Sequence, residues 1–204
     1  MATTTYTGAN YAISNLRAKL GTLARPNNFK VSLSLASTGD SWLGVGARVY
    51  SMPSMNSIKD TYQFRCEKAE LPGRTVATTD DSMSGTSVKL PYDMTYNDIQ
   101  LSIICSVDML ERKFFEQWMD FIVKPGNPTN TGNAGTIAYY SDYAKGNKLK
   151  VSQLNDSGTE ILTYTCHDVY PIAMTPMNAT WEENNTYQRF GVTLSYRYHL
   201  WSIT

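Results

Sequence analysis

Apolar and polar residues alternate along much of this chain. Residues 29–35 alternate over the whole segment, which is the period of a half-buried β-strand. Residues 99–107 begin in the same way and then become an unbroken apolar run, which is typical of a strand covered on both faces. Shorter runs predict further strands, at 62–66, 75–79, 86–90, 136–143, 148–154 and 160–169. The chain is therefore predicted to be mainly β.

The C-terminal region predicts a long β-hairpin. Two β-rich segments, at 173–182 and 186–199, are joined by the polar residues 183–185. In the second segment every other residue is apolar or aromatic, at Phe190, Val192, Leu194, Tyr196 and Tyr198. We therefore expect a long hairpin with two chemically different faces, one of them apolar and aromatic.

One segment has the spacing of an amphipathic helix. Within residues 109–123, large apolar side chains recur every three or four positions, at Leu110, Phe114, Trp118 and Ile122. Asp108 and Glu111 are spaced as an N-terminal capping pair, and Pro125-Gly126 ends the helix. Because the apolar strand at 99–107 needs a cover, we predict that this helix packs over it.

Three segments have no sustained period. Residues 1–25 are predicted to form an N-terminal arm with a short helix, residues 37–60 an extended loop, and residues 126–135 a loop rich in glycine and asparagine. Leu71-Pro72-Gly73 and residues 155–158 predict turns. Because no linker divides the remainder, 26–204 is predicted to be one domain that carries the extended loop at 37–60.

The charge balance narrows the possible functions. The 204 residues include 18 basic and 18 acidic side chains, so a non-specific nucleic-acid binder is disfavoured. A neutral surface with 14 tyrosines favours association instead. Cys66, Cys105 and Cys166 are widely spaced, so we expect buried thiols in a reducing compartment. Without a leader or an apolar run of membrane-spanning length, we expect no membrane anchor and synthesis in the cytoplasm.

Candidate chemical groups are sparse. Cys166-His167-Asp168 contains the residue types of a catalytic relay, but neighbours on a strand point to opposite faces. His167 and His199 have no second metal ligand at a suitable spacing, and residues 126–135 lack the end of a phosphate-binding loop. We therefore predict no catalytic residue, no cofactor and no metal. Weaker candidates are two acidic pairs and one aromatic and basic cluster, at Asp80-Asp81, Glu182-Glu183, Tyr187, Arg189, Tyr196, Arg197 and Tyr198.

An ordered set of short motifs runs from residue 24 to the C-terminus. Arg25, Pro26 and Phe29 stand at the entry to the first predicted strand, and Leu71-Pro72-Gly73 forms a later turn. The other motifs are Phe64-x-Cys66, Arg112-Lys113-Phe114-x-x-Trp118, Val169-Tyr170-Pro171, Trp181-Glu182-x-x-Asn185 and residues 190–196. In this order they resemble the tail tube proteins of contractile-tailed bacteriophages, relatives in fold of the type VI secretion inner-tube protein.

The resemblance implies a fold, an assembly and a set of partners. The fold is mainly β (α+β), an antiparallel β-sandwich or split barrel with one amphipathic helix, whose strands join between protomers into a hexameric tube barrel. The rings of this homo-hexamer stack into the inner tail tube, through which phage DNA passes without sequence-specific binding. Further partners are the tail sheath, baseplate and tail-terminator proteins. The protein is then a structural virion component, not an enzyme, assembled in the host bacterial cytoplasm.

The resemblance also places individual segments. Leu110, Phe114, Trp118 and Ile122 are expected to pack the helix on the outside of the barrel, with its charged face towards the sheath. The arm at 1–25 and the loop at 37–60 are expected to make contacts between rings. Both segments are extended, so a baseplate protein that initiates the tube is the alternative within this family. A cytoplasmic ligand-binding β domain is the alternative from another class, and it rests on the tyrosine-rich last strand.

Overall fold

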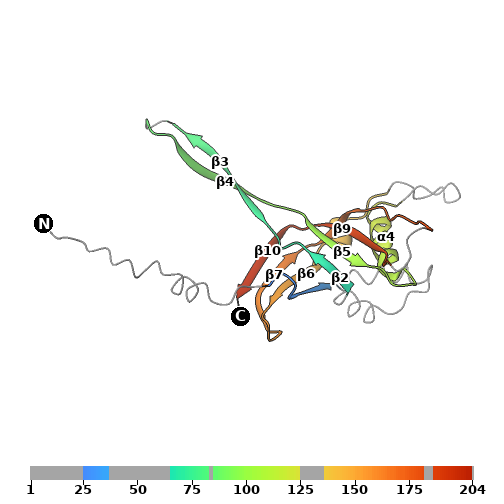
Figure 1. Cartoon of the computed structure of the whole chain (residues 1–204). Coiled ribbons are helices and arrows are strands. Elements are labelled where there is room, and N and C mark those ends of the chain that lie inside the picture. Colours follow the sequence, from blue (N-terminus) through green and yellow to red (C-terminus); the bar gives the residue numbers. More distant parts are fainter. Residues whose placement is uncertain (1–24, 37–64, 83–84, 125–135, 182–185, 204) are drawn as a thin grey trace, which may run out of the picture.

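The computed structural model describes residues 25–36, 65–82, 85–124, 136–181 and 186–203. Ten strands and two helices lie in this part of the chain (Figure 1). The predicted arm at 1–25 lies outside the described residues except for Arg25, and the predicted loops at 37–60 and 126–135 lie outside them entirely.

Sheet A contains four antiparallel strands in the order β1-β6-β7-β10. Their bounds are Phe29–Ser34 for β1, Lys148–Leu154 for β6, Glu160–His167 for β7 and Tyr198–Ile203 for β10. The predictions at 29–35, 148–154 and 160–169 are confirmed. The predicted turn at 155–158 connects β6 to β7, and Gly158 adopts there a φ of 79°, which glycine tolerates best.

Sheet B contains four antiparallel strands in the order β2-β5-β9-β8. Their bounds are Cys66–Ala69 for β2, Ile99–Ile104 for β5, Arg189–Ser195 for β9 and Tyr170–Met174 for β8. Of the strand predicted at 62–66, only the last two residues are described, and β2 begins there.

The core lies between the inner faces of the two sheets. Sheet A contributes Val31, Leu149 and Val151 to it, and these three side chains are nearly inaccessible to solvent. Sheet B contributes alternate residues of its two central strands, at Ile99, Leu101, Ile103, Phe190, Val192 and Leu194. The alternation read from the sequence is therefore the alternation between core and surface.

The last hairpin is shorter than predicted. β8 and β9 pair with each other, but Tyr196 and Arg197 separate β9 from β10, and β10 joins sheet A. Because the chain changes sheets here, the alternation slips by one residue: Tyr196 and His199 are buried, while Tyr198 is exposed. Tyr198 therefore does not share one face with Phe190, Val192 and Leu194, as the continuous alternation had predicted.

A third sheet consists of β3 (Arg74–Asp81) and β4 (Val88–Tyr96) alone. These strands were predicted at 75–79 and 86–90; β3 is longer at both ends, whereas β4 begins two residues later than predicted and continues six residues further. They continue the directions of β2 and β5 and project from the body as a long ribbon (Figure 1). The bulge between them leaves Tyr92 without an opposing residue, beside Pro91, which has no backbone N–H to donate.

Helix α4 (Leu110–Ile122) closes one end of the core and contacts β8. Its ring cluster of Phe114, Phe115 and Trp118 is fully buried, and Phe115 meets Phe190 edge-to-face at 6.1 Å between ring centroids. Leu110 and Ile122, which were expected on the packing face, are only half-buried. The buried face is therefore rotated towards Phe115 relative to the predicted one.

Strand β5 is not covered on both faces as predicted. Gln100 is exposed, Ser102 and Ile104 are half-buried, and the strand ends at Ile104, so no other element of the described residues fully covers its outer face. Helix α4 instead reaches the inner side, where Phe115 lines the core together with Leu101 and Ile103. The unbroken apolar run reflects the passage from β5 into α4, because Cys105 there is half-buried against Met177.

The segment predicted as a strand at 136–143 is also different in the structure. Ile137 makes an isolated bridge to Val123, and residues Tyr140–Tyr143 form the short helix α5. The backbone carbonyl of Tyr143 accepts a hydrogen bond from Trp118 Nε1 at 3.1 Å. This bond satisfies the polar edge of the indole ring that is otherwise buried.

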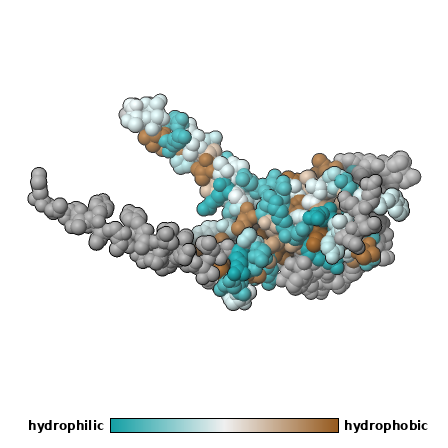
Figure 2. All heavy atoms as spheres, in the orientation of Figure 1, coloured by the Kyte–Doolittle hydropathy of each residue, from teal (hydrophilic) through white to brown (hydrophobic). Residues whose placement is uncertain are grey.

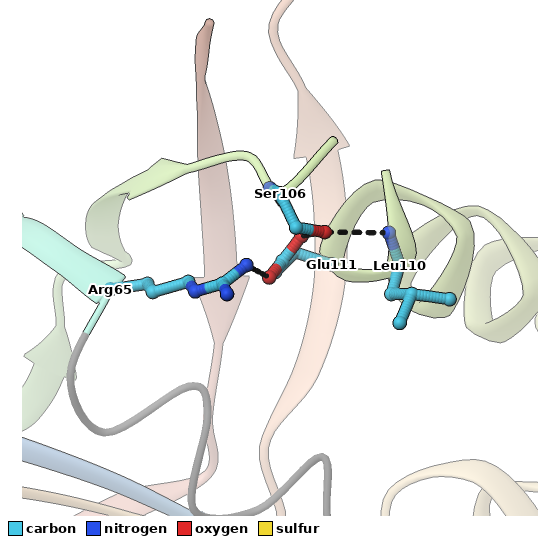
Figure 3. Close-up of polar contacts among 4 residues, drawn as sticks. All are labelled: Arg65, Ser106, Leu110 and Glu111. Atoms are coloured by element: carbon cyan, nitrogen blue, oxygen red, sulfur yellow. Dashed lines mark hydrogen bonds and ion pairs between the residues drawn. The ribbon is translucent and has the colours of Figure 1, made fainter. Parts of the chain in front are cut away.

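The start of α4 is held by a buried carboxylate rather than by the predicted capping pair (Figure 3). Glu111 Oε2 accepts hydrogen bonds from the backbone N–H and the hydroxyl of Ser106, at 2.9 and 2.8 Å. Its other oxygen pairs with Arg65, at the start of β2. Burial raises the pKa of Glu111, but the bonds from Ser106 and the charge of Arg65 outweigh it and leave the pKa below its usual value.

Truncating Trp118 should destabilise the domain. In urea denaturation, Trp118→Ala is expected to lower the free energy of unfolding by about 3–5 kcal/mol, because it removes a fully buried ring and leaves a cavity. Lys113→Ala, on the exposed side of the same helix, is the matched control and should change it by less than about 0.5 kcal/mol. Equal effects of the two variants would contradict the packing described for α4.

Neutralising Glu111 should also destabilise the domain. Glu111→Gln is expected to cost about 1–3 kcal/mol at pH 7, since one charged acceptor of two buried hydrogen bonds is lost. Because the folded-state pKa is lowered, this difference should shrink as pH falls below about 4.3 and the wild-type carboxyl is protonated. Glu116→Gln, in an exposed ion pair with Arg112, should cost at most about 0.5 kcal/mol. Chemical denaturation across pH measures both, and a loss no larger than that of the control would refute the role of Glu111.

Candidate assembly surface

The β3–β4 ribbon has the surface of an interface but no core of its own. Cross-strand partners share a face, so Val76 lies beside Met94 on one side, and Leu90 lies on the opposite side with Val88. All four side chains are exposed in this chain, and so is Tyr92 at the bulge, with 71% of its surface accessible. Figure 2 shows apolar residues spaced along the ribbon out to its far end. A two-stranded hairpin is marginally stable alone in water, so this ribbon requires a partner surface.

The base of the ribbon is fixed by a cluster of aromatic rings around His199. The imidazole lies 5.1 Å from the ring of Tyr96 and 5.7 Å from that of Tyr164, measured between centroids. Tyr196 lies 3.4 Å from His199 Nδ1, and its hydroxyl also donates to the carbonyl of Gly73 at 3.4 Å. At the base of the ribbon, the cluster therefore ties the start of β3 and the end of β4 to sheet A.

An apolar ledge lies beside this cluster. Trp201 and Ile203 of β10 stand opposite Tyr164 and Leu162 of β7, on the inner side of sheet A. They border a cleft of about 330 Å³ at the base of the ribbon and are more than half exposed. Sheet B does not cover this end, because its strands lead away into the ribbon. A large apolar surface of this kind is typical of a protein contact.

Each of the four edge strands of the two sheets pairs with a strand on one side only within the described chain. They are β1 and β10 in sheet A and β2 and β8 in sheet B. An edge strand leaves backbone N–H and C=O groups unpaired, which is a template for pairing with another chain. The described residues form no closed barrel. The geometry therefore favours association through strand edges.

The motif positions fall mostly on these surfaces. Pro26, Phe29 and Leu71 line a groove of about 560 Å³ between β1 and β2. The carbonyl of Arg25 accepts a hydrogen bond from Gln153, at 2.7 Å, and Pro72 borders the cleft at the base of the ribbon. Gly73 accepts the bond from Tyr196 described above, and Trp181 is fully exposed.

The candidate catalytic groups are not brought together. Cys166 faces the core and His167 faces outward, where its ring stacks on Tyr198 at 4.7 Å. Cys166 lies instead opposite His199 in the register, but burial raises the pKa of this thiol to about 12, so it is not a thiolate at neutral pH. Cys66 and Cys105 are half-buried rather than buried, and all three cysteines are free thiols.

The weaker candidates are also dispersed. Asp80 and Asp81 are neighbours on β3 and point to opposite faces of the ribbon, while Glu182 and Glu183 lie outside the described residues. In the aromatic and basic cluster, Tyr196 is buried and Arg189 pairs with Glu67. Tyr187, Arg197 and Tyr198 do not join them on one face. The cluster expected for a ligand is therefore not formed.

The described residues offer neither a metal site nor a membrane-spanning helix. No three potential metal ligands of the described ranges come close enough together to hold an ion. Within those ranges, no helical segment combines the length and the hydrophobicity that a membrane span requires.

Sequence comparison identifies one family. The family model described as phage tail tube protein matches residues 24–202, which is most of the chain. No curated protein sequence matches.

Solved structures of contractile injection systems share the fold. A chain of the anti-feeding prophage baseplate is 11% identical, with a TM-score of 0.57 over 89% of this chain and 97% of that one. A chain of the PVC sheath-tube complex is 13% identical, with a TM-score of 0.56 over 93% of this chain and 97% of that one. A chain of the PVC sheath/tube terminator is 12% identical, with a TM-score of 0.52 over 89% and 97%. At these identities the similarity is one of fold.

The aromatic cluster should make stability depend on pH. Burial, followed by the charge of Arg74, lowers the pKa of His199, so the folded state favours the neutral ring. Below about pH 6.5 the unfolded chain binds a proton that the folded chain resists, and the free energy of unfolding should fall as pH decreases. His199→Gln should flatten this dependence between about pH 7 and 5, whereas His167→Gln should retain it. Thermal unfolding across pH measures the slope, and equal slopes in wild type and His199→Gln would contradict the assignment.

Proposed function

The chain belongs to the phage tail tube protein family, and from this we propose that it is the repeating subunit of a tail tube built from stacked hexameric rings. The observation that carries the proposal is the β3–β4 ribbon, which exposes apolar side chains on both faces and has no partner within the described chain. The free strand edges support it further, because closure between subunits satisfies their backbone groups.

Helix α4 is proposed to lie on the outside of the tube. Its buried face closes the core, and the opposite face carries charged residues, including the Arg112–Glu116 ion pair at 2.7 Å. A charged, solvated helix face suits contact with a surrounding sheath. The arm at 1–25 and the loop at 37–60 are proposed to contact the neighbouring ring.

The remaining partners follow from the same role. Solved structures of similar fold come from complexes named as a baseplate, a sheath-tube complex and a sheath/tube terminator. We propose that this tube likewise meets a sheath, a baseplate and a terminator, and that phage DNA passes through its lumen. The subunit is then a non-enzymatic part of the virion tail, assembled in the host cytoplasm. A ring that starts the tube at the baseplate is the second candidate, favoured by the likeness to the anti-feeding prophage baseplate chain.

Electron microscopy of the purified protein, with its mass in solution, tests the proposal. We expect long hollow tubes of stacked six-fold rings. Isolated rings that elongate only on a baseplate would favour the initiator. A monomer that never assembles, even when concentrated, would contradict both and favour a ligand-binding domain.

A variant of the ribbon adds a sharper test. Leu90→Asp should abolish tubes while leaving the unfolding transition of the monomer unchanged, because Leu90 is exposed within its own chain. Val107→Asp introduces the same charge at a fully exposed position outside the strands and serves as the matched control. Normal tubes from Leu90→Asp would show that the ribbon is not the assembly surface.

A further inference from the structure

The two outer faces of the sandwich differ in charge. Successive residues of a strand point to opposite sides, so the register identifies the outward residues of each sheet. Among the described residues, α4 closes one end of the core and contacts β8, and on the outer face of sheet A Ser152 and Thr163 are buried, while Lys148 and Lys150 are exposed. A subunit of a hollow tube must turn one face to the lumen and another to the outside. The net charge of each outer face distinguishes the face that suits the lumen from the face that suits the outside.

The outer face of sheet A is basic. Lys30, Lys148 and Lys150 lie on it, together with one acidic side chain, Glu160, that reaches Lys30 at 3.5 Å. Neither Lys148 nor Lys150 has a carboxylate within 4 Å among the described residues. Three positive charges against one negative charge leave an excess of two on this face of each subunit.

The outer face of sheet B is neutral. Its two basic side chains are both paired: Arg189 Nη1 lies 3.3 Å from Glu67, and Lys68 Nζ lies 3.9 Å from Glu70. The rest of the face consists of uncharged residues, at Gln100, Ser102, Thr175, Gly191 and Thr193. Two positive and two negative charges cancel.

Gly191 leaves space on the outer face of sheet B for the side chain of Thr175. Its backbone N–H donates to the hydroxyl of Thr175 at 2.7 Å, and a Cβ at Gly191 would meet Thr175 Cγ2 at 3.1 Å. The two residues border a shallow hollow of about 190 Å³ lined mainly by polar side chains. No large apolar side chain projects from this hollow.

The ribbon that extends from sheet B adds no net positive charge. β3 and β4 extend from β2 and β5, and their charged residues are two basic and three acidic. These residues are Arg74, Lys89, Asp80, Asp81 and Asp93. Asp81 and Asp93 lie on the face of the ribbon that carries Leu90, whereas Arg74, Asp80 and Lys89 lie on the opposite face. The ribbon as a whole therefore carries one more acidic residue than basic residues.

We propose that the outer face of sheet B lines the lumen and that the basic outer face of sheet A points away from it. The proposal rests on the proposed tube. Phosphates bind to clustered fixed cations with a strength that grows with the number of contacts, and six-fold repetition would multiply every unpaired lysine in a ring. DNA passes freely only along a surface without such an excess. The neutral face of sheet B meets this condition, and the face of sheet A does not.

Two matched cysteine variants test the assignment. Thr193→Cys lies on the outer face of sheet B in β9, and Thr165→Cys lies on the outer face of sheet A in β7; both threonines are half-buried in an interior strand. The probes are a maleimide on a polyethylene glycol too bulky to enter the tube and a small maleimide dye. Wild-type protein gives the background from its own three cysteines.

In unassembled protein, both variants should react with the bulky probe. In tubes, Thr165→Cys should still react with it, whereas labelling of Thr193→Cys should drop to the wild-type background. The small dye should still label Thr193→Cys in tubes, which separates a hydrated lumen from a buried subunit contact. If either variant fails to assemble, Gln100→Cys and Lys150→Cys stand beside the two threonines on the same faces and replace them.

Three results would overturn the assignment. They are reaction of the bulky probe with Thr193→Cys in tubes, protection of Thr165→Cys from it, and loss of small-dye labelling at Thr193→Cys. In each case tubes have formed, so the proposed function stands while the choice of face is wrong. Failure of wild-type protein to form tubes would contradict the proposed function itself, and the assignment with it.

Discussion

The burial of the aromatic face of α4 is the contact on which the domain depends. Phe115 against Phe190 closes the end of the core, and Trp118 is held by the carbonyl of Tyr143. Glu111 fixes the start of the helix by accepting two hydrogen bonds from Ser106 and pairing with Arg65. A buried carboxylate is costly without such partners, so this end of the sandwich tolerates few arrangements. The ion pair between Glu111 and Arg65, which immediately precedes β2, therefore fixes β2 relative to α4.

Outside this closed core, the domain exposes apolar side chains. The two sheets are packed together only where both are present, and beyond that point the chain continues as the β3–β4 ribbon and as the open end of β10. The side chains there include Leu90, Trp201 and Ile203, which are exposed but apolar. A protein without net charge cannot keep such surfaces apart by repulsion. In the proposed tube, association through defined strand edges would cover these surfaces.

The junction between β9 and β10 shows why a regular pattern misled the prediction. Residues 190–199 alternate without interruption in sequence, yet Arg197 carries the chain from sheet B to sheet A. His199 thereby becomes buried among tyrosines, and Tyr198 turns outward onto His167. Alternation identifies a strand but not the sheet that it joins, because both sheets impose the same period of two.

Local patterns alone determined the strands at 29–35, 148–154 and 160–169, the helix at 109–123, and a family resemblance that the family match confirms. These features depend on neighbours in sequence, where side-chain period and turn residues act directly. The tertiary structure decided the roles of Glu111 and Tyr140–Tyr143, the rotation of α4 towards Phe115, and the charge of the two outer faces. Each of these depends on residues that are distant in sequence and become neighbours only when the sheets pack, so no local period could report them.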